Sequence, residues 1–144
     1  MTSKIFHQKC DNKGPTIILY RHINGYIFGG YSSISWSSSG GYQNAPECFI
    51  FTLTNIYNTK PTLFNSNNNG KDVYHGENYG PYFGNSADIG IYADFIKSDC
   101  LSNFPRSYKD TLGKGNSIFT GNMNDSNFKI NEIEVFKIFN QKNE

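Results

Sequence analysis

An Asn-Gly pair at positions 24 and 25 separates two apolar, aromatic-containing runs, Thr16–Tyr20 and Tyr26–Tyr31. Both central residues of a type I′ turn need a positive φ angle, which Asn and Gly adopt at low cost. The sequence therefore predicts two strands joined by a tight turn. A hairpin at this position commits the chain to a fold that contains an antiparallel sheet.

Aromatic residues make up 16% of the 144-residue chain, and charged residues only 17%. Aromatic and β-branched side chains fit the pleated surface of a sheet, whereas the strong helix formers are scarce here. A chain of this length has room for one hydrophobic core. We therefore expect a mainly β (β-rich α+β) domain that spans residues 1–144.

Further elements follow from apolar patterning. Phe6 and Cys10 lie four apart, and Gly14-Pro15 follows, so a short helix is predicted over Ile5–Lys13. The second hairpin strand is expected to continue to Trp36, with Trp36 on the core face. Strands or short extended pieces are also predicted over Cys48–Leu53 (as a buried central strand), Thr62–Phe64, Asp72–His75, Tyr82–Phe83, Asp88–Tyr92, Ser117–Thr120 and Phe128–Phe139, the last with a bulge or a change of buried face.

Glycines punctuate these strands, a pattern typical of bulges and tight bends in a curved sheet. The predicted architecture is a two-sheet antiparallel β-sandwich with few short helices. The Asn-rich tract from Asn65 to Gly70 is expected to be a solvated loop tip.

The charge balance excludes several kinds of partner. Thirteen basic and twelve acidic residues give a net charge of +1, so no nucleic-acid footprint is expected. No apolar stretch is long enough to cross a bilayer, and the N-terminal residues lack the apolar core of a signal peptide. We expect a cytoplasmic protein that does not insert directly into a membrane.

Metal, cofactor and nucleophile motifs are missing from the sequence. Cys10, Cys48 and Cys100 show no CxxC spacing and are expected to be reduced, mostly buried thiols. The three histidines show no ligand spacing, and no GxGxxG, phosphate-loop or GxSxG motif occurs. We therefore predict no catalytic residue, no metal and no cofactor.

Two groups of residues still leave chemistry open. Carboxylates interspersed with apolar strands can act as acid and base, or can cap turns, and the second interpretation is the simpler one. These carboxylates are Glu47, Glu77, Asp88 and Asp94. Tyrosines on the surface can contact a carbohydrate or a protein, or can belong to the core. These tyrosines are Tyr26, Tyr31, Tyr42, Tyr79 and Tyr82.

Five segments in fixed order resemble the TLDc domain family, which is found in oxidation-resistance proteins, in relatives of nuclear-receptor coactivators and in many protist proteins. They are Phe6–Thr16, Gly25–Tyr31 followed by Trp36, Ala45–Leu53, Gly80–Gly84 followed by Asp88, and Ile130–Phe139. The residues that match the family motifs are Gly14, Gly25, Gly29, Gly30, Trp36, Glu47, Gly84, Asp88 and Glu134. The family usually has a further leading strand or helix, which this chain is expected to lack because only five residues precede Phe6.

The resemblance implies a non-enzymatic interaction domain. Family members bind and regulate the cytosolic part of the vacuolar proton-pumping ATPase and protect cells against oxidative stress. The expected partner is therefore an ATPase subunit, through which a monomeric domain reaches a vacuolar or endosomal membrane. An aromatic patch with a polar rim suits such an interface, so the partner-binding candidates are Tyr79, Tyr82, Arg106, Lys109 and Lys114.

Two alternatives from other classes remain open. One alternative is an enzyme that handles oxidants or hydrolyses a small substrate, with Glu47, His75, Asp88 or the Cys10 thiol as the working group. A shared site would then bring His75, Glu47 and Asp88 together. The other alternative is a carbohydrate-binding β-sandwich that uses its surface tyrosines.

Overall fold

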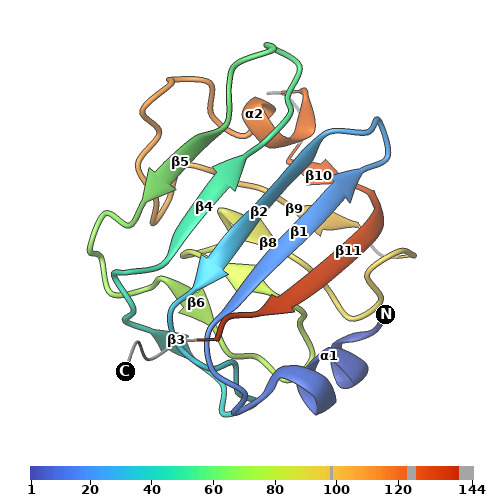
Figure 1. The fold of residues 1–144 in the computed structure, drawn as a ribbon, viewed down its shortest axis with the longest axis vertical. Coiled ribbons are helices and arrows are strands. Elements are labelled where there is room, and N and C mark those ends of the chain that lie inside the picture. Colours follow the sequence, from blue (N-terminus) through green and yellow to red (C-terminus); the bar gives the residue numbers. More distant parts are fainter. Residues whose placement is uncertain (98, 123–125, 140–144) are drawn as a thin grey trace.

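The computed structural model describes residues 1–97, 99–122 and 126–139, and it shows two antiparallel sheets that form a sandwich (Figure 1). One sheet has five strands, in the order β11 (Ile130–Lys137), β1 (Thr16–His22), β2 (Ile27–Ser32), β4 (Phe49–Thr52) and β5 (Thr62–Asn65). The other has six short strands, in the order β10 (Asn127–Phe128), β9 (Cys100–Leu101), β8 (Ile89–Gly90), β7 (Tyr82–Phe83), β6 (Val73–Tyr74) and β3 (Tyr42–Gln43). The predicted fold class is confirmed.

The first helix and the hairpin lie close to where the sequence places them. Helix α1 spans Ser3–Cys10, and the Thr2 hydroxyl caps it by accepting the Ile5 amide at 3.3 Å. β1 and β2 pair directly, with Ile18 opposite Gly30. The turn at Asn24-Gly25 therefore joins neighbouring antiparallel strands, as predicted.

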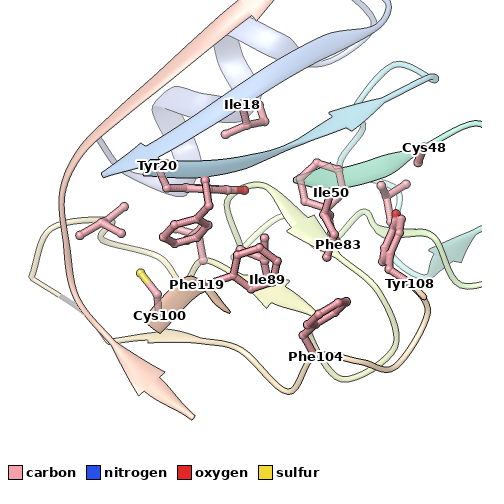
Figure 2. Packing of buried hydrophobic residues seen from close by; sticks show 14 of the residues in the cluster. Ile18, Tyr20, Cys48, Ile50, Phe83, Ile89, Cys100, Phe104, Tyr108 and Phe119 are labelled. Carbon is pink, nitrogen blue, oxygen red and sulfur yellow. The ribbon is translucent and has the colours of Figure 1, made fainter. Parts of the chain in front are cut away.

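The core lies between the two sheets and is built largely from aromatic rings (Figure 2). Phe28 of β2 lies 5.2 Å from Phe119, and Phe64 of β5 lies 5.0 Å from Phe104, measured between ring centroids. Gly30 has no side chain because a Cβ there would lie 2.6 Å from the Phe83 ring of the facing sheet. Close approach of the two sheets at this point therefore depends on glycine.

Trp36 is fully buried, as predicted, although no strand carries it. β2 ends at Ser32, and Trp36 instead forms an isolated bridge with Asp11. Its ring packs edge-on against Phe6 and Phe83, with centroids 5.5 Å away in both cases. Its indole Nε1 donates to the Thr16 hydroxyl at 2.9 Å. Trp36 thus joins α1, β1 and the six-stranded sheet.

Residues Ser117–Thr120 form a helical turn, α2, so the prediction of an extended segment is wrong. Gly121 ends the turn with a φ of 77° and donates its amide to the Ser117 carbonyl. Ile118 and Phe119 are both buried in the core. Two adjacent apolar residues carry no period that separates a helical turn from a strand.

The C-terminal run is divided between two sheets. The chain leaves β10 in one sheet, passes Lys129 and enters β11 in the other. The predicted bulge is present, but it lies at the start of β11, where the register against β1 shifts between Arg21 and His22. Within β11 the alternation is regular, with Val135 opposite the buried Ile18 and Phe136 opposite Ile17.

The Asn-rich tract is held to the protein rather than only solvated. The Asn67 side-chain amide donates to the Arg106 carbonyl at 2.9 Å, and the Asn69 amide donates to the Ser107 hydroxyl at 2.9 Å. The isolated bridge between Ser66 and Tyr108 runs beside these contacts. The tract therefore fixes the segment that follows Phe104.

Candidate functional site

The outer face of the five-stranded sheet carries a continuous set of apolar side chains. Strand register places Phe136, Ile17, Tyr31 and Phe49 in one row across β11, β1, β2 and β4. A second row contains Leu19, Phe51 and Leu63, with Gly29 between them. We call this surface the outer apolar band; its members are Ile17, Leu19, Tyr31, Phe49, Phe51, Leu63 and Phe136.

The outer apolar band is open to solvent. Phe136 is 46% exposed and Leu63 is 43% exposed, and the other members are half-buried. Within residues 1–97, 99–122 and 126–139, neither helix crosses this face, because α1 and α2 lie at opposite ends of the sandwich (Figure 1). Contiguous exposed apolar area of this kind marks interaction sites on folded domains.

Aromatic rings lie next to one another across the band. The centroids of Tyr31 and Phe49 are 5.0 Å apart, and those of Phe49 and Phe51 are 6.2 Å apart. The Phe51 ring lies over Gly29, where an added Cβ would approach it to 2.7 Å. The band has a charged rim on one side, where Arg21 and Glu132 lie 3.8 Å apart.

Sequence reasoning did not identify this band. It predicted Cys48–Leu53 as a buried central strand, but β4 is buried on one face only. Ile50 and Thr52 point into the sandwich, whereas Phe49 and Phe51 belong to the outer face. The sequence feature that could have indicated the band is that β1 and β4 carry apolar residues at odd and at even positions, and therefore on both faces of the sheet.

Two of the predicted partner residues lie in a cluster of tyrosines on the six-stranded sheet and the segments beside it. Tyr79 lies 5.6 Å from Tyr82 and 5.4 Å from Tyr74, measured between ring centroids. Tyr42 and Tyr92 extend the cluster. Tyr79 is half-buried, whereas Tyr82 is buried, and burial raises the pKa of the Tyr82 phenol.

The three predicted basic residues have different surroundings. Arg106 and Lys109 are exposed on the segment that wraps around Asp88. Lys114 is half-buried, with its ammonium 4.6 Å from the centre of the Tyr57 ring. No ring or ion-pair contact among the described residues joins these three to the tyrosine cluster. Their role in partner binding stays a prediction.

Asp88 and Gly84 form a structural anchor. The buried Asp88 carboxylate accepts the amides of Arg106 and Ser107 at 2.9 Å and that of Tyr108 at 3.1 Å. Gly84, with a φ of 88°, packs directly against this carboxylate, where no side chain fits. Burial raises the pKa of Asp88 to about 6, and the three amides oppose this rise. The contacts show a carboxylate that organises a loop.

The remaining family-motif residues are spread over the fold. Gly14 and Gly25 lie in turns with positive φ, whereas Gly29 and Gly30 lie in β2. Glu47 is exposed in the turn before β4, and Glu134 is exposed on the edge strand β11. The four glycines determine the course of the backbone, in turns or within β2, and such positions are spread along the chain.

Asp72 is a second buried carboxylate that sequence reasoning missed. It accepts the Ala45 amide at 2.7 Å and the Ser66 hydroxyl, and its backbone carbonyl accepts the Tyr108 hydroxyl at 2.7 Å. A lone Asp at the start of a two-residue strand gives no signal of this kind. Asp72 and Asp88 together attach the long loops to the six-stranded sheet.

The three residues proposed for an enzyme site contact different parts of the protein. His75 lies against Trp36, Glu47 is exposed in a turn, and Asp88 is surrounded by backbone amides. The described residues also contain no group of three His, Cys, Asp or Glu side chains placed to hold a metal ion. The contacts provide no acid-base pair among these candidates.

His7 is held by a carboxylate and by backbone carbonyl groups. His7 Nδ1 lies 2.7 Å from Asp11, whose other oxygen accepts the Ser38 hydroxyl at 2.6 Å. His7 Nε2 lies 2.8 Å from the Tyr79 carbonyl oxygen and donates to it, so this nitrogen is not free to act as a base. These contacts hold α1 against the segment that follows β6.

The stability of the domain is expected to fall in mild acid because of His75. Its Nδ1 lies 2.8 Å from the Ser37 hydroxyl, and its buried Nε2 has no partner among the described residues. Burial lowers the pKa of His75 below its usual 6.5, with nearby Asp11 opposing and His7 adding to the effect. The unfolded chain therefore binds the proton more readily, and stability is lost as the pH falls below 6.5.

The test is urea denaturation at about pH 7.5 and about pH 5.5. We expect the unfolding free energy to decrease less between these two values in a His75→Gln variant than in the wild type. His22, whose pKa burial also lowers, is unchanged in both proteins and serves as the internal background. An equal decrease in the two proteins would contradict this role of His75.

The cysteines are expected to be unreactive in the folded protein. All three are unpaired and buried, and burial raises the pKa of Cys10, of Cys48 and, to about 12, of Cys100. The thiolate is the reactive form, so iodoacetamide should label the native chain at least about tenfold more slowly than the urea-unfolded chain. Mass spectrometry measures this for each thiol, and fast native labelling of Cys10 would support the oxidant-handling alternative.

Comparisons with known proteins agree with the fold. The model of the TLDc domain matches residues 1–139. The MTOR-associated protein MEAK7 of Danio rerio is 43% identical over 44 residues, which are 31% of this chain and 10% of the relative. The protein of the same name from Gallus gallus is 37% identical over 51 residues, which are 33% of this chain and 11% of the relative.

The aligned part of these curated relatives is thus about a tenth of their length. Among the described residues, neither helix has the length and apolar character needed to cross a membrane. The family match covers nearly the whole chain, including both sheets and the Asp88 anchor. The chain therefore belongs to the TLDc domain family.

Proposed function

We propose that the domain is a non-enzymatic interaction module that binds a protein partner through its outer apolar band. The observation that carries this proposal is the uncovered face of the five-stranded sheet, with Phe136 and Leu63 close to half exposed. Aromatic side chains such as Tyr31 and Phe49 supply large contact area at low entropy cost, which suits a binding hot spot.

The partner that we propose first is the cytosolic part of the vacuolar proton-pumping ATPase. Membership of the TLDc family supports this choice of partner. We propose, on the same ground, that the domain contributes to protection against oxidative stress. The relatives carry the name MTOR-associated protein, which supports an mTOR-containing assembly as the second candidate. Both partners would use the same surface of the domain.

The experiment compares wild-type and variant domains as bait in lysate from the source cells. The variant Leu63→Glu/Phe136→Glu places two charges in the band at exposed positions, so the fold should tolerate it. Ile23→Glu/Ile96→Glu is the matched control, because Ile23 is 54% exposed and Ile96 is 44% exposed outside the band. Recovery of ATPase subunits and of mTOR is quantified by immunoblotting.

We expect the band variant to lose at least about tenfold in recovered ATPase, while the control variant matches the wild type. Equal recovery by all three baits would exclude the band as the contact surface. A parallel Arg106→Glu/Lys109→Glu variant tests the basic residues predicted from the sequence. If the wild type recovers neither ATPase subunits nor mTOR, the proposed partners are wrong.

A further inference from the structure

A cavity of about 330 Å³ lies between α1 and the edge of the five-stranded sheet. Phe6 and Val135 supply apolar lining, and three lysines also line the cavity: Lys9 at the end of α1, Lys13 in the turn that follows, and Lys137 of β11, whose ammonium lies 5.2 Å from the centre of the Phe139 ring. Among the described residues, no carboxylate lines this cavity. We call it the edge groove.

The positive charge of the edge groove is not compensated within the described part of the chain. All three lysines are exposed, and none takes part in the ion pairs of the described residues. Asp11, which lies between Lys9 and Lys13 in sequence, points its carboxylate at His7 and Ser38 instead. The groove is therefore complementary to a ligand that is partly apolar and negatively charged.

The groove lies along an open strand edge. β11 pairs with β1 on one side, and no described residue pairs with its other side. Val135 and Lys137, which line the groove, lie on the inner face of this same strand. A free edge of eight residues can accept an added strand from another chain, and the groove would receive every second side chain of that strand.

We propose that the edge groove binds an extended acidic peptide segment of a protein partner, which adds a strand to β11 and turns glutamate side chains into the groove. The methylene groups of a glutamate would contact Val135, and its carboxylate would reach the lysines. Alternate side chains would lie beside Phe136 on the outer face. This inference adds to the proposed interaction role a second surface, which meets the outer apolar band only at Phe136.

The probe is an end-blocked, fluorophore-labelled peptide of alternating Glu and Val, with the eight-residue length of β11. Fluorescence anisotropy measures its affinity for the wild-type domain and for Lys9→Glu/Lys137→Glu. We expect binding to weaken at least about tenfold in this variant and to weaken with added salt. Lys4→Glu/Lys60→Glu is the matched control, because Lys4 and Lys60 are also exposed lysines but lie outside the groove.

Two further measurements show whether binding of the peptide depends on strand pairing with β11 and whether it depends on the outer apolar band. The same peptide with alternate backbone nitrogens methylated cannot pair with β11, and we expect it to lose at least about tenfold in affinity. The Leu63→Glu variant changes the outer apolar band on β5, at the opposite edge of the sheet from β11, and should bind the peptide like the wild type. Failure of the outer band as a partner surface would therefore leave this result unchanged.

Three outcomes would overturn the proposal: no binding of the Glu-Val peptide to the wild type, equal binding to Lys9→Glu/Lys137→Glu, or equal binding of the methylated peptide. Amide chemical shifts of the wild type, recorded with and without peptide, locate the contact. The expected changes fall on β11 and α1, and changes confined to β5 would contradict the assignment.

Discussion

Replacing Trp36 with alanine is expected to unfold the domain or to leave it barely folded. The side chain is fully buried, contacts Phe6 and Phe83, and donates to Thr16. Removing a buried ring of this size costs about 3–5 kcal/mol, against about 5–15 kcal/mol of total stability for a domain. Far-ultraviolet circular dichroism during urea denaturation measures the change without relying on indole fluorescence.

The matched control for Trp36→Ala is Phe136→Ala, which also removes an aromatic ring but from a position that is 46% exposed. Its cost should stay below about 1 kcal/mol, because the ring is largely solvated in the folded state. If the two variants unfolded at the same urea concentration, the assignment of Trp36 as the joint between α1 and both sheets would be wrong.

Asp88→Ala is expected to destabilise the domain by about 4 kcal/mol. Three buried or partly buried amides, those of Arg106, Ser107 and Tyr108, would lose their acceptor. Each buried donor that is left unpaired costs about 1–3 kcal/mol. Urea denaturation gives the size of the effect, and amide hydrogen exchange of residues 106–108 shows whether the loop opens locally.

Asp110→Ala is the control for this prediction. Asp110 also accepts three backbone amides, those of Leu112, Gly113 and Gly115, but its side chain is only half-buried. Water can replace a carboxylate at such a position, so the loss should be about 1 kcal/mol. If Asp88→Ala lowered the free energy of unfolding by no more than Asp110→Ala does, burial of the Asp88 carboxylate would not be the reason for its contribution to stability.

The hairpin was predictable because its turn and its strands give independent local signals that agree. Asn24-Gly25 specifies the turn, and the apolar runs on either side specify the strands. Short elements such as β3 and α2 have no turn signal and strand or helix pattern that agree with each other. Their conformation depends on tertiary contacts, including those that bury Ile118 and Phe119.

The outer apolar band shows where sequence patterning reaches its limit. Phe49, Ile50 and Phe51 are consecutive apolar residues, a pattern typical of a strand that is covered on both faces. Whether a second layer covers such a strand depends on the rest of the molecule. The two helices of the described part of the chain lie at the ends of the sandwich, so no described element covers this apolar face.

The candidate site was predictable only in part for a similar reason. The sequence predicts Tyr79 and Tyr82 as surface contact residues, but Tyr82 is buried among other tyrosines, which no local pattern shows. Lys137 is far from Lys9 and Lys13 along the chain, and only the pairing of β1 with β11 brings these lysines to one groove.

The pairing of β1 with β11 also determines when the domain can fold during synthesis. Thr16 lies opposite Lys137, so β1 pairs with a strand that is synthesised after all the other described strands. Until β11 emerges, β1 remains an edge strand, and Ile18 and Tyr20 lack their cross-strand neighbours Val135 and Ile133. Contacts this distant in sequence slow folding, typically to milliseconds or seconds for β proteins. A nascent chain that stalls before Ile130 therefore exposes the edge most prone to association with other chains, and we expect it to depend on chaperones until β11 has been synthesised.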